Sequence, residues 1–288
     1  MTALIFGAGG QDGFYLSELL EQQQVKCIGI SRHGDFINAD VASYENVSGI
    51  ISLHKPAYIF HLAANSTTGH DAMFENNRTI SLGALNILES VKNFSPHTKI
   101  FISGSGLQFK NENNPIKESD PFEARDAYCV SRIQSVYAAR YFRTLGIQVY
   151  TGYFFNHDSP RRTERHMTKK IAEAAKRIGA GSNEKLEIGD IDVIKEYTYA
   201  ADIVKGIWTL VNQSAITEAN ISSGEGHSIK DWLIECFNSV NKNWEKHVDL
   251  KKDFTSDYKK LVSDPSLIFS LGWKPQVSFH ELAKIMMK

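Results

Sequence analysis

The chain has few cysteines and no long apolar run. Its three cysteines, Cys27, Cys129 and Cys236, are odd in number, far apart and without the spacing of metal ligands, which is typical of reduced thiols in a cytosolic protein. No apolar run approaches the roughly 20 residues that cross a bilayer, and the N-terminus has neither a basic region nor a cleavage site. The sequence therefore predicts a cytoplasmic protein with no membrane partner.

An excess of charge of either sign is also missing. The 32 Lys and Arg residues are matched by 33 Asp and Glu residues, so the field that attracts nucleic acid is absent and we expect no nucleic-acid partner. The ten histidines are dispersed, with no close pair on one helix face, and we expect no metal site. The remaining composition, 42% hydrophobic and 23% charged, is that of a globular protein with one large or two small domains.

A glycine-rich turn over 7–13 lies between an apolar run over 3–6 and an amphipathic run over 14–20. Glycines at its first, fourth and seventh places predict a strand, a tight turn and a helix whose N-terminal N–H groups can bind a diphosphate. The spacing alone is a weak signal, but its position after a strand favours dinucleotide binding over an ordinary turn. The expected cofactor residues here are Gly7, Gly10, Gln11, Asp12 and Gly13.

The end of a second strand, over 25–30, bears on the choice of cofactor. Arg32 follows it, where an acidic residue would bind the 2′-hydroxyl of NAD and an arginine would accommodate the 2′-phosphate of NADP. Arg32 favours NADP; a solvated loop arginine is the alternative, and Asp35 keeps NAD open. Asp40 would either meet the adenine edge or cap a helix that begins near Ala42.

Apolar strands alternate with amphipathic helices along the first half of the chain. A strand over 58–62, a helix over 82–91 and a strand over 99–102 continue the β-α-β order. This order predicts an α/β fold with a Rossmann-type, doubly wound parallel sheet and helices on both faces, followed by a smaller C-terminal substrate-binding portion.

Small and hydroxylated residues stand at the carboxyl ends of two of these strands, where chemistry collects in such sheets. Ala63 and Ala64 allow close approach to the nicotinamide half of a cofactor, although a turn explains them nearly as well. Ser103 and Ser105 follow the strand over 99–102. We expect one of these serines to take part in the chemistry.

A helix over 126–145 carries the residues best suited to acid–base chemistry. Tyr128 and Arg132 are four apart, so they lie on one face, one turn from each other. A tyrosine with the ordinary pKa of about 10 is a poor base at neutral pH, but a neighbouring cation favours the phenolate. The position after the serine-bearing strand favours Tyr128 as an acid/base over a plain surface pair.

At these residues the chain resembles the extended short-chain dehydrogenase/reductases, and among them the GDP-mannose 4,6-dehydratases, over nearly its whole length. The resemblance implies an NAD(P)-dependent enzyme that acts on a nucleotide sugar. It also implies a homodimer, because the segment 32–40 is much shorter than the loop with which the family builds its tetramer. The motifs that carry the resemblance, in the family's order, are 7–13, 155–162, 168–171, 224–228 and 272–275.

The resemblance further implies substrate residues and domain boundaries. Asn156, Arg161 and Lys170 would meet the nucleotide-sugar diphosphate and its surroundings, and Lys195 stands where the family has an arginine near the phosphates. Phe254 stands where an arginine normally closes over the nucleotide. The dinucleotide-binding domain would span 1–162, with 190–212 returning to it, and an interleaved nucleotide-sugar-binding portion would span 163–288.

Two departures from the family pattern affect the chemistry. Family dehydratases carry Ser/Thr, a small or acidic residue and then Glu where this chain has Gly104, Ser105 and Gly106. That glutamate removes the C5 proton after C4 oxidation, and glycine supplies no base. Arg132 replaces a lysine; it keeps the positive charge but has no accessible neutral form with which to relay protons. Ser103 or Ser105 would still polarise the C4 oxygen.

Three functions remain open. The first is hydride chemistry at C4 of a nucleotide sugar, in which Tyr128 and a neighbouring serine act on the C4 oxygen. The enzyme would be a 4-ketosugar reductase, an epimerase or a 4-dehydrogenase. The second is a true 4,6-dehydratase whose base comes from elsewhere, with Glu123, Asp126 and His157 as candidates. The third is a regulator that binds cofactor or nucleotide sugar without catalysis. Loss of the glutamate and the lysine counts against the second, and retention of Tyr128 and of the run 156–162 counts against the third.

Overall fold

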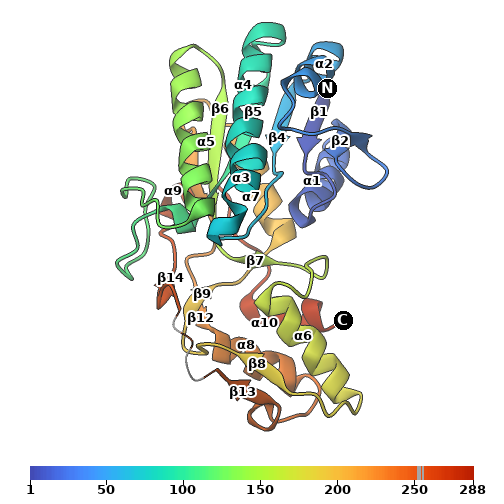
Figure 1. Ribbon diagram of the computed structural model, residues 1–288, viewed down its shortest axis with the longest axis vertical. Coiled ribbons are helices and arrows are strands. Elements are labelled where there is room, and N and C mark those ends of the chain that lie inside the picture. The colour runs from blue at the N-terminus through green and yellow to red at the C-terminus, as the bar shows by residue number, and fades with distance from the viewer. Residues whose placement is uncertain (252–253, 255) are drawn as a thin grey trace.

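The computed structural model describes residues 1–251, 254 and 256–288. An upper body is built on a sheet whose strands all run parallel, in the order β11-β6-β5-β4-β1-β2-β3 (Figure 1). Its strands are β1 (Thr2–Phe6), β2 (Lys26–Ser31), β3 (Ile37–Asn38), β4 (Tyr58–His61), β5 (Lys99–Ser105), β6 (Val149–Phe154) and β11 (Glu218–Ile221).

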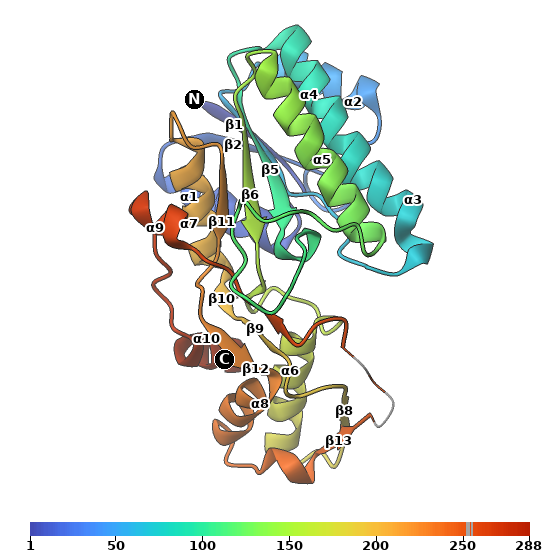
Figure 2. The same ribbon diagram turned by 90° about the vertical axis from the view of Figure 1, so that its left-hand side faces the viewer.

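Helices cover both faces of this sheet (Figure 2). One face carries α1 (Gln11–Gln22), α7 (Ala200–Val211) and α9 (Ser266–Ser270); the other carries α2 (Tyr44–His54), α4 (Gly83–Phe94) and α5 (Ala127–Thr144). Successive residues of a strand point to opposite faces, so Leu4 packs in the core beneath α2 and α4 while Ile5 packs in the core beneath α1 and α7. The predicted doubly wound Rossmann-type fold is confirmed.

A smaller lower body contains three helices packed around the buried Trp232. Its helices are α6 (Met167–Gly179), α8 (Ile229–Asn238) and α10 (Phe279–Met287). Its short strands pair as β12 (Gly226–Ser228) with β9 (Ile194–Glu196) and β14 (Lys260–Leu261), and as β13 (Val248–Leu250) with β8 (Leu186–Ile188). The segment 190–212 is divided between the bodies, because β9 lies in the lower one and α7 in the upper one.

Short elements connect these parts. The pair β7 (His157–Asp158) and β10 (Thr198–Tyr199) lies where the two bodies meet (Figure 1). The helix expected over 82–91 is extended: it runs to Phe94 and continues from the preceding turns. The preceding turns are short helical segments: the 3-10 helix η1 (His70–Ala72), the α-helix α3 (Met73–Asn76) and the π-helix η2 (Asn77–Leu82). Two further 3-10 helices are η3 (Gly106–Gln108) and η4 (Trp244–Lys246).

The cap of α2 differs from one of the two expectations for Asp40. The helix begins at Tyr44, and the hydroxyl of Ser43 accepts the hydrogen bond from the Asn46 N–H that caps it. Asp40 lies too far before the helix and instead accepts a hydrogen bond from the Ala42 N–H at 2.9 Å. The prediction that Asp40 caps this helix is therefore wrong.

Across the described ranges, no helix combines the length and the apolar character needed to span a bilayer.

Candidate active site

A cleft of about 340 Å³ opens beyond the carboxyl ends of β1, β5 and β6, and residues from both bodies line it. A second hollow of about 210 Å³ adjoins it and shares Gly7, Gly10, Leu62 and Ala64 with it. The chain leaves β1 towards β2 on one side and returns to β4 on the other, and parallel sheets bind ligands at this kind of reversal. The two hollows thus form one groove at the expected place.

The glycine turn shapes the floor of this groove. Gly7 has a φ of +93°, and a Cβ there would lie 2.6 Å from the Ala63 nitrogen. A Cβ at Gly13 would lie 2.5 Å from the Gly7 carbonyl oxygen, so only glycine allows the first turn of α1 to approach β1 this closely. No side chain caps α1, and its first N–H groups are therefore available to an anion. These residues fit the diphosphate of a dinucleotide.

Charged pairs flank the second hollow. The Arg32 guanidinium lies 3.0 Å from the Glu75 carboxylate, and the Asp40 carboxylate lies 2.9 Å from the guanidinium of Arg78, a residue that the sequence did not single out. All four side chains are partly exposed, so a ligand phosphate can compete for either arginine. The predicted cofactor residues that line this hollow are Gly7, Gly10, Arg32, Asp40, Ala63 and Ala64.

Tyr128 and Arg132, predicted on one face of α5, both line the larger cleft. They are 8% and 4% exposed. The guanidinium carbon lies 5.0 Å from the centre of the Tyr128 ring, and the same group donates hydrogen bonds to the carbonyl and hydroxyl oxygens of Ser103. A buried cation thus lies directly over the phenol, and no buried acid among the described residues pairs with it.

The two candidate serines differ in their hydrogen bonds. The Ser103 hydroxyl donates to the His61 carbonyl at 3.1 Å and accepts from Arg132 at 2.8 Å, so it is fully engaged. The Ser105 hydroxyl accepts from the Leu107 N–H at 3.2 Å, and its proton has no acceptor within the described ranges. Ser105 is therefore the serine that can donate to a ligand oxygen.

The residue whose carbonyl accepts from Ser103, His61, carries a neutral imidazole. Burial and the charge of Arg132 lower the pKa of this imidazole to about 4.

The two glycines flanking Ser105 have no room for a side chain. A Cβ at Gly104 would lie 2.5 Å from the Tyr153 ring, and a Cβ at Gly106 would lie 2.7 Å from the Phe155 ring. Phe155 also lines the cleft. A glutamate at position 106 would require this buried ring to move. The Phe155 ring therefore occupies the space in which the side chain of the family's glutamate would begin.

The other candidate bases do not offer a free lone pair in the cleft. Glu123 pairs with Arg125 at 3.0 Å, and Asp126 caps α5 by accepting from the Cys129 N–H at 2.7 Å; neither lines the cleft. His157 does line it, but both of its ring nitrogens are hydrogen-bonded.

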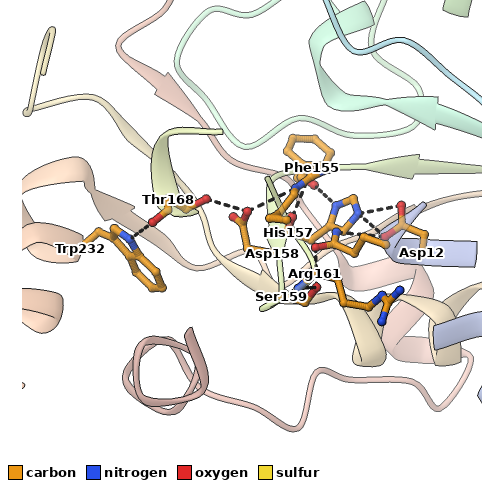
Figure 3. Close-up of polar contacts among 10 residues, drawn as sticks. Asp12, Phe155, His157, Asp158, Ser159, Arg161, Thr168 and Trp232 are labelled. Carbon is orange, nitrogen blue, oxygen red and sulfur yellow. Dashed lines mark hydrogen bonds and ion pairs between the residues drawn. The ribbon is translucent and has the colours of Figure 1, made fainter. Parts of the chain in front are cut away.

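His157 contacts the first turn of α1 through the carboxylate of Asp12 (Figure 3). Its Nδ1 lies 2.8 Å from the Phe155 carbonyl oxygen, and its Nε2 lies 3.0 Å from the Asp12 carboxylate. Burial opposes both charges, yet the ion pair raises the pKa of His157 above its ordinary value and lowers that of Asp12 to about 2. The side chain of Asp12 is therefore engaged within the protein, as is that of Gln11, which accepts from the Ser159 hydroxyl at 2.7 Å.

Of the four predicted substrate residues, Asn156 alone lines the cleft, and its buried Oδ1 has no partner in the described part of the chain. Arg161 points away, with its guanidinium 3.7 Å from the centre of the Phe14 ring. The Lys170 ammonium donates to the Glu187 carbonyl at 3.1 Å, outside the cleft. Phe254 is also outside it, half-exposed against Gly189.

A cluster of basic side chains lies at the lower edge of the cleft. Arg162 and His166 line it, although the sequence did not assign them, and the run of basic residues before α6 was the signal that could have found them. Burial and the neighbouring Arg162 lower the pKa of His166. Burial also lowers the pKa of the fourth predicted residue, Lys195, to about 8, although Asp158 opposes this shift. The cluster therefore has the charge and the desolvation that favour an anionic ligand.

Metal ligands do not gather in this site. Nowhere in the described ranges do three or more His, Cys, Asp or Glu side chains come together in a group that could hold a metal ion. The chemistry of the cleft is that of a phenol, a guanidinium and a hydroxyl beside a dinucleotide-shaped groove.

Comparisons with known proteins agree with this geometry. The sequence profile of the family described as GDP-mannose 4,6 dehydratase matches residues 4–286. GDP-mannose 4,6 dehydratase 1 of Arabidopsis thaliana is 30% identical over 99% of this chain and 88% of its own length. The structure of UDP-glucose 4-epimerase of Thermus thermophilus with NAD has a TM-score of 0.85 at 20% identity and covers 100% of this chain and 98% of the epimerase. RMD of Pseudomonas aeruginosa, complexed with NADPH, has a TM-score of 0.85 at 19% identity, with 99% and 97% coverage.

Proposed function

Because the chain belongs to the GDP-mannose 4,6-dehydratase family of extended short-chain dehydrogenase/reductases, we propose that it performs hydride chemistry at C4 of a GDP-linked sugar. It would act as a 4-ketosugar reductase, an epimerase or a 4-dehydrogenase. One observation carries this proposal: Tyr128 and Ser105 line the same cleft as the glycine turn, while position 106 has neither a carboxylate nor room for one.

The proposed cofactor is NADP, with NAD as the alternative. The glycine turn would hold its diphosphate, and Arg32 its 2′-phosphate. Ala63 and Ala64 would allow the nicotinamide half to lie close to the backbone. Relatives of the same fold were solved with NADPH and with NAD. The bound cofactor supplies or accepts the hydride.

The chain's own residues would handle the proton. When C4 is reduced, the Tyr128 hydroxyl gives its proton to the C4 oxygen as hydride arrives at carbon; when C4 is oxidised, the phenolate takes that proton back. Ser105 would donate a hydrogen bond to the same oxygen, and the Arg132 guanidinium would place a positive charge beside the reacting phenol. Asn156, Arg162 and His166 would bind the sugar-linked diphosphate.

We also infer a homodimer. The outer faces of α4 and α5 expose apolar and aromatic side chains, among them Leu85, Tyr137 and Tyr141. These two helices lie side by side on one face of the upper body (Figure 2). The proposed dimer would bury this face, in agreement with the short segment 32–40.

Replacing Arg32 by Ala is expected to weaken NADP binding by about tenfold or more and to leave NAD binding nearly unchanged, because only NADP carries the 2′-phosphate. The measurement is the ratio of the two dissociation constants. Glu75→Gln is the matched variant: it releases the guanidinium from its ion pair without removing it, and NADP binding should be equal or tighter. An equal loss for both cofactors in Arg32→Ala would contradict the assignment.

The proposed activity is tested by incubating the protein and NADP(H) or NAD(H) with GDP-, UDP-, CDP- and dTDP-sugars and their 4-keto forms. We expect hydride transfer, or exchange of deuterium at C4, with a GDP-sugar. No transfer and no exchange with any sugar would reject the enzymatic proposal.

The second candidate is a 4,6-dehydratase with a base from elsewhere, which the names of the relatives favour. It predicts a product lighter by one water. Mass spectrometry of the same incubations separates the two candidates, and we expect no such product because Glu123 and Asp126 lie outside the cleft and His157 has no free nitrogen.

A further inference from the structure

Asp12 places a carboxylate in the first turn of α1, beside the glycine turn. On the proposed function, the cofactor diphosphate lies at this helix N-terminus. A partly buried carboxylate so close to a diphosphate would repel it, since charges interact more strongly where water is partly excluded. The site therefore requires a positive group that compensates Asp12.

His157 is that group. Its Nδ1 faces a carbonyl oxygen, which only accepts hydrogen bonds, and its Nε2 faces both carboxylate oxygens of Asp12, at 3.0 and 3.1 Å. Both ring nitrogens must donate, and only the imidazolium carries two N–H groups. The other charged group facing the pair is Arg162, which follows β7. The neutral neighbours include the Gln11 amide, which donates to the Asp12 carboxylate at 3.2 Å, and the Phe154 ring, 5.4 Å from the imidazole between ring centres.

The short strand that carries His157 is also anchored to the lower body by hydrogen bonds (Figure 3). The next residue, Asp158, accepts from the Thr168 hydroxyl at 2.6 Å, and the Thr168 carbonyl accepts from the indole N–H of the buried Trp232 at 3.1 Å. Hydrogen bonds thus run from the first turn of α1 through β7 and α6 to the core of the lower body. His157 joins the part of the cleft assigned to the cofactor to the part assigned to the sugar.

We propose that His157 is a positioning residue for cofactor binding: as an imidazolium it neutralises Asp12 and holds this carboxylate away from the diphosphate. This inference rests on the proposed function. It assigns His157 no role as a base, because both nitrogens are occupied by donated hydrogen bonds. It also predicts that charge at residue 157, not its shape alone, determines affinity for the cofactor.

The test is a titration of the full chain with NADPH, followed by fluorescence, for the wild type, His157→Asn, Asp12→Asn and the double variant. We expect His157→Asn to weaken binding by about tenfold or more, since it leaves a partly buried carboxylate beside the ligand without its ion-pair partner. Adding Asp12→Asn should restore most of this loss. Asp12→Asn alone should bind NADPH more tightly than the wild type, because it removes the negative charge beside the diphosphate.

The pH dependence supplies a second readout. Because the pair raises the pKa of His157, the imidazolium is complete at low pH and is lost as pH rises through that raised value. Wild-type affinity should therefore fall towards alkaline pH, and Asp12→Asn should flatten this fall. The matched control is His280→Asn, because His280 pairs with Glu235 on the surface of the lower body; its affinity should not change.

The outcomes separate the inference from the proposed function. The inference is overturned if His157→Asn binds NADPH as tightly as the wild type. It is also overturned if the double variant melts at the wild-type temperature but does not regain the affinity lost in His157→Asn. If His157→Asn does not fold, an unchanged pH dependence in Asp12→Asn overturns it instead. NADPH binding with the expected pattern but no turnover of any sugar supports the inference and rejects the enzymatic proposal; no NADPH or NADH binding by the wild type rejects both.

Discussion

Tyr128→Phe is expected to lower turnover of the active nucleotide sugar by on the order of a hundredfold or more, because it removes the proposed acid/base and nothing else. The Tyr128 ring is buried beneath the Arg132 guanidinium, and a phenyl ring preserves that packing. Affinity for NADPH and the melting temperature should stay close to wild type. The measurement is kcat with the sugar identified by the substrate panel.

The same helix supplies matched controls for this variant. Tyr137 and Tyr141 lie on the exposed side of α5, with 58% and 60% of their side chains accessible. Tyr137→Phe and Tyr141→Phe make the same chemical change away from the cleft and should retain full turnover. A Tyr128→Phe enzyme that turns over as fast as these controls would remove Tyr128 from the mechanism.

Arg132→Met is expected to reduce turnover about as much as Tyr128→Phe, by on the order of a hundredfold. It removes the buried cation over the phenol and leaves the Ser103 carbonyl without its donor. The turnover of Arg132→Lys should lie between those of the wild type and Arg132→Met. Lysine keeps the positive charge but lacks the planar guanidinium that donates to both Ser103 oxygens. The measurement is kcat per active molecule for all three proteins, together with their melting temperatures.

Turnover per active molecule, compared with stability, distinguishes a chemical role of Arg132 from a structural one. If the guanidinium acts on the chemistry, kcat should fall in Arg132→Met while the melting temperature, the fraction of active protein and the affinity for NADPH stay close to wild type. A structural role alone would lower the melting temperature and the fraction of active protein, and kcat per active molecule would be unchanged. Wild-type kcat per active molecule in Arg132→Met would contradict the chemical role.

Much of the fold could be predicted from residues that are neighbours in the sequence. The apolar run before Gly7, the amphipathic run after Gly13 and the helix that ends before Gly146 each follow from local periodicity and from glycine conformation. The parallel order of the sheet follows from the alternation of strands and helices, since parallel strands need a crossover. Tyr128 and Arg132 on one face of α5 follow from the helical repeat.

The direction of individual side chains could not be predicted in this way. Arg161 and Arg162 are adjacent, yet the first lies over the Phe14 ring and the second lines the cleft, because their partners come from different elements. Likewise, the Ser103 hydroxyl donates to the His61 carbonyl and cannot also donate to a ligand. The Ser105 hydroxyl only accepts a hydrogen bond, from the Leu107 N–H, so it remains able to donate. A motif identifies such residues as a group but does not separate them.

The fold class, the glycine turn and the family could all be inferred from the amino-acid order, because they depend on local periodicity, backbone freedom and short motifs. The folded chain adds two facts that no local pattern contains: Phe155 occupies the space beside Gly106, and His157 pairs with Asp12, which is 145 positions away along the chain. Burial and charge pairing depend on which elements the packed sheet and helices bring together. Those contacts decide which side chains are free to react and which are held in place.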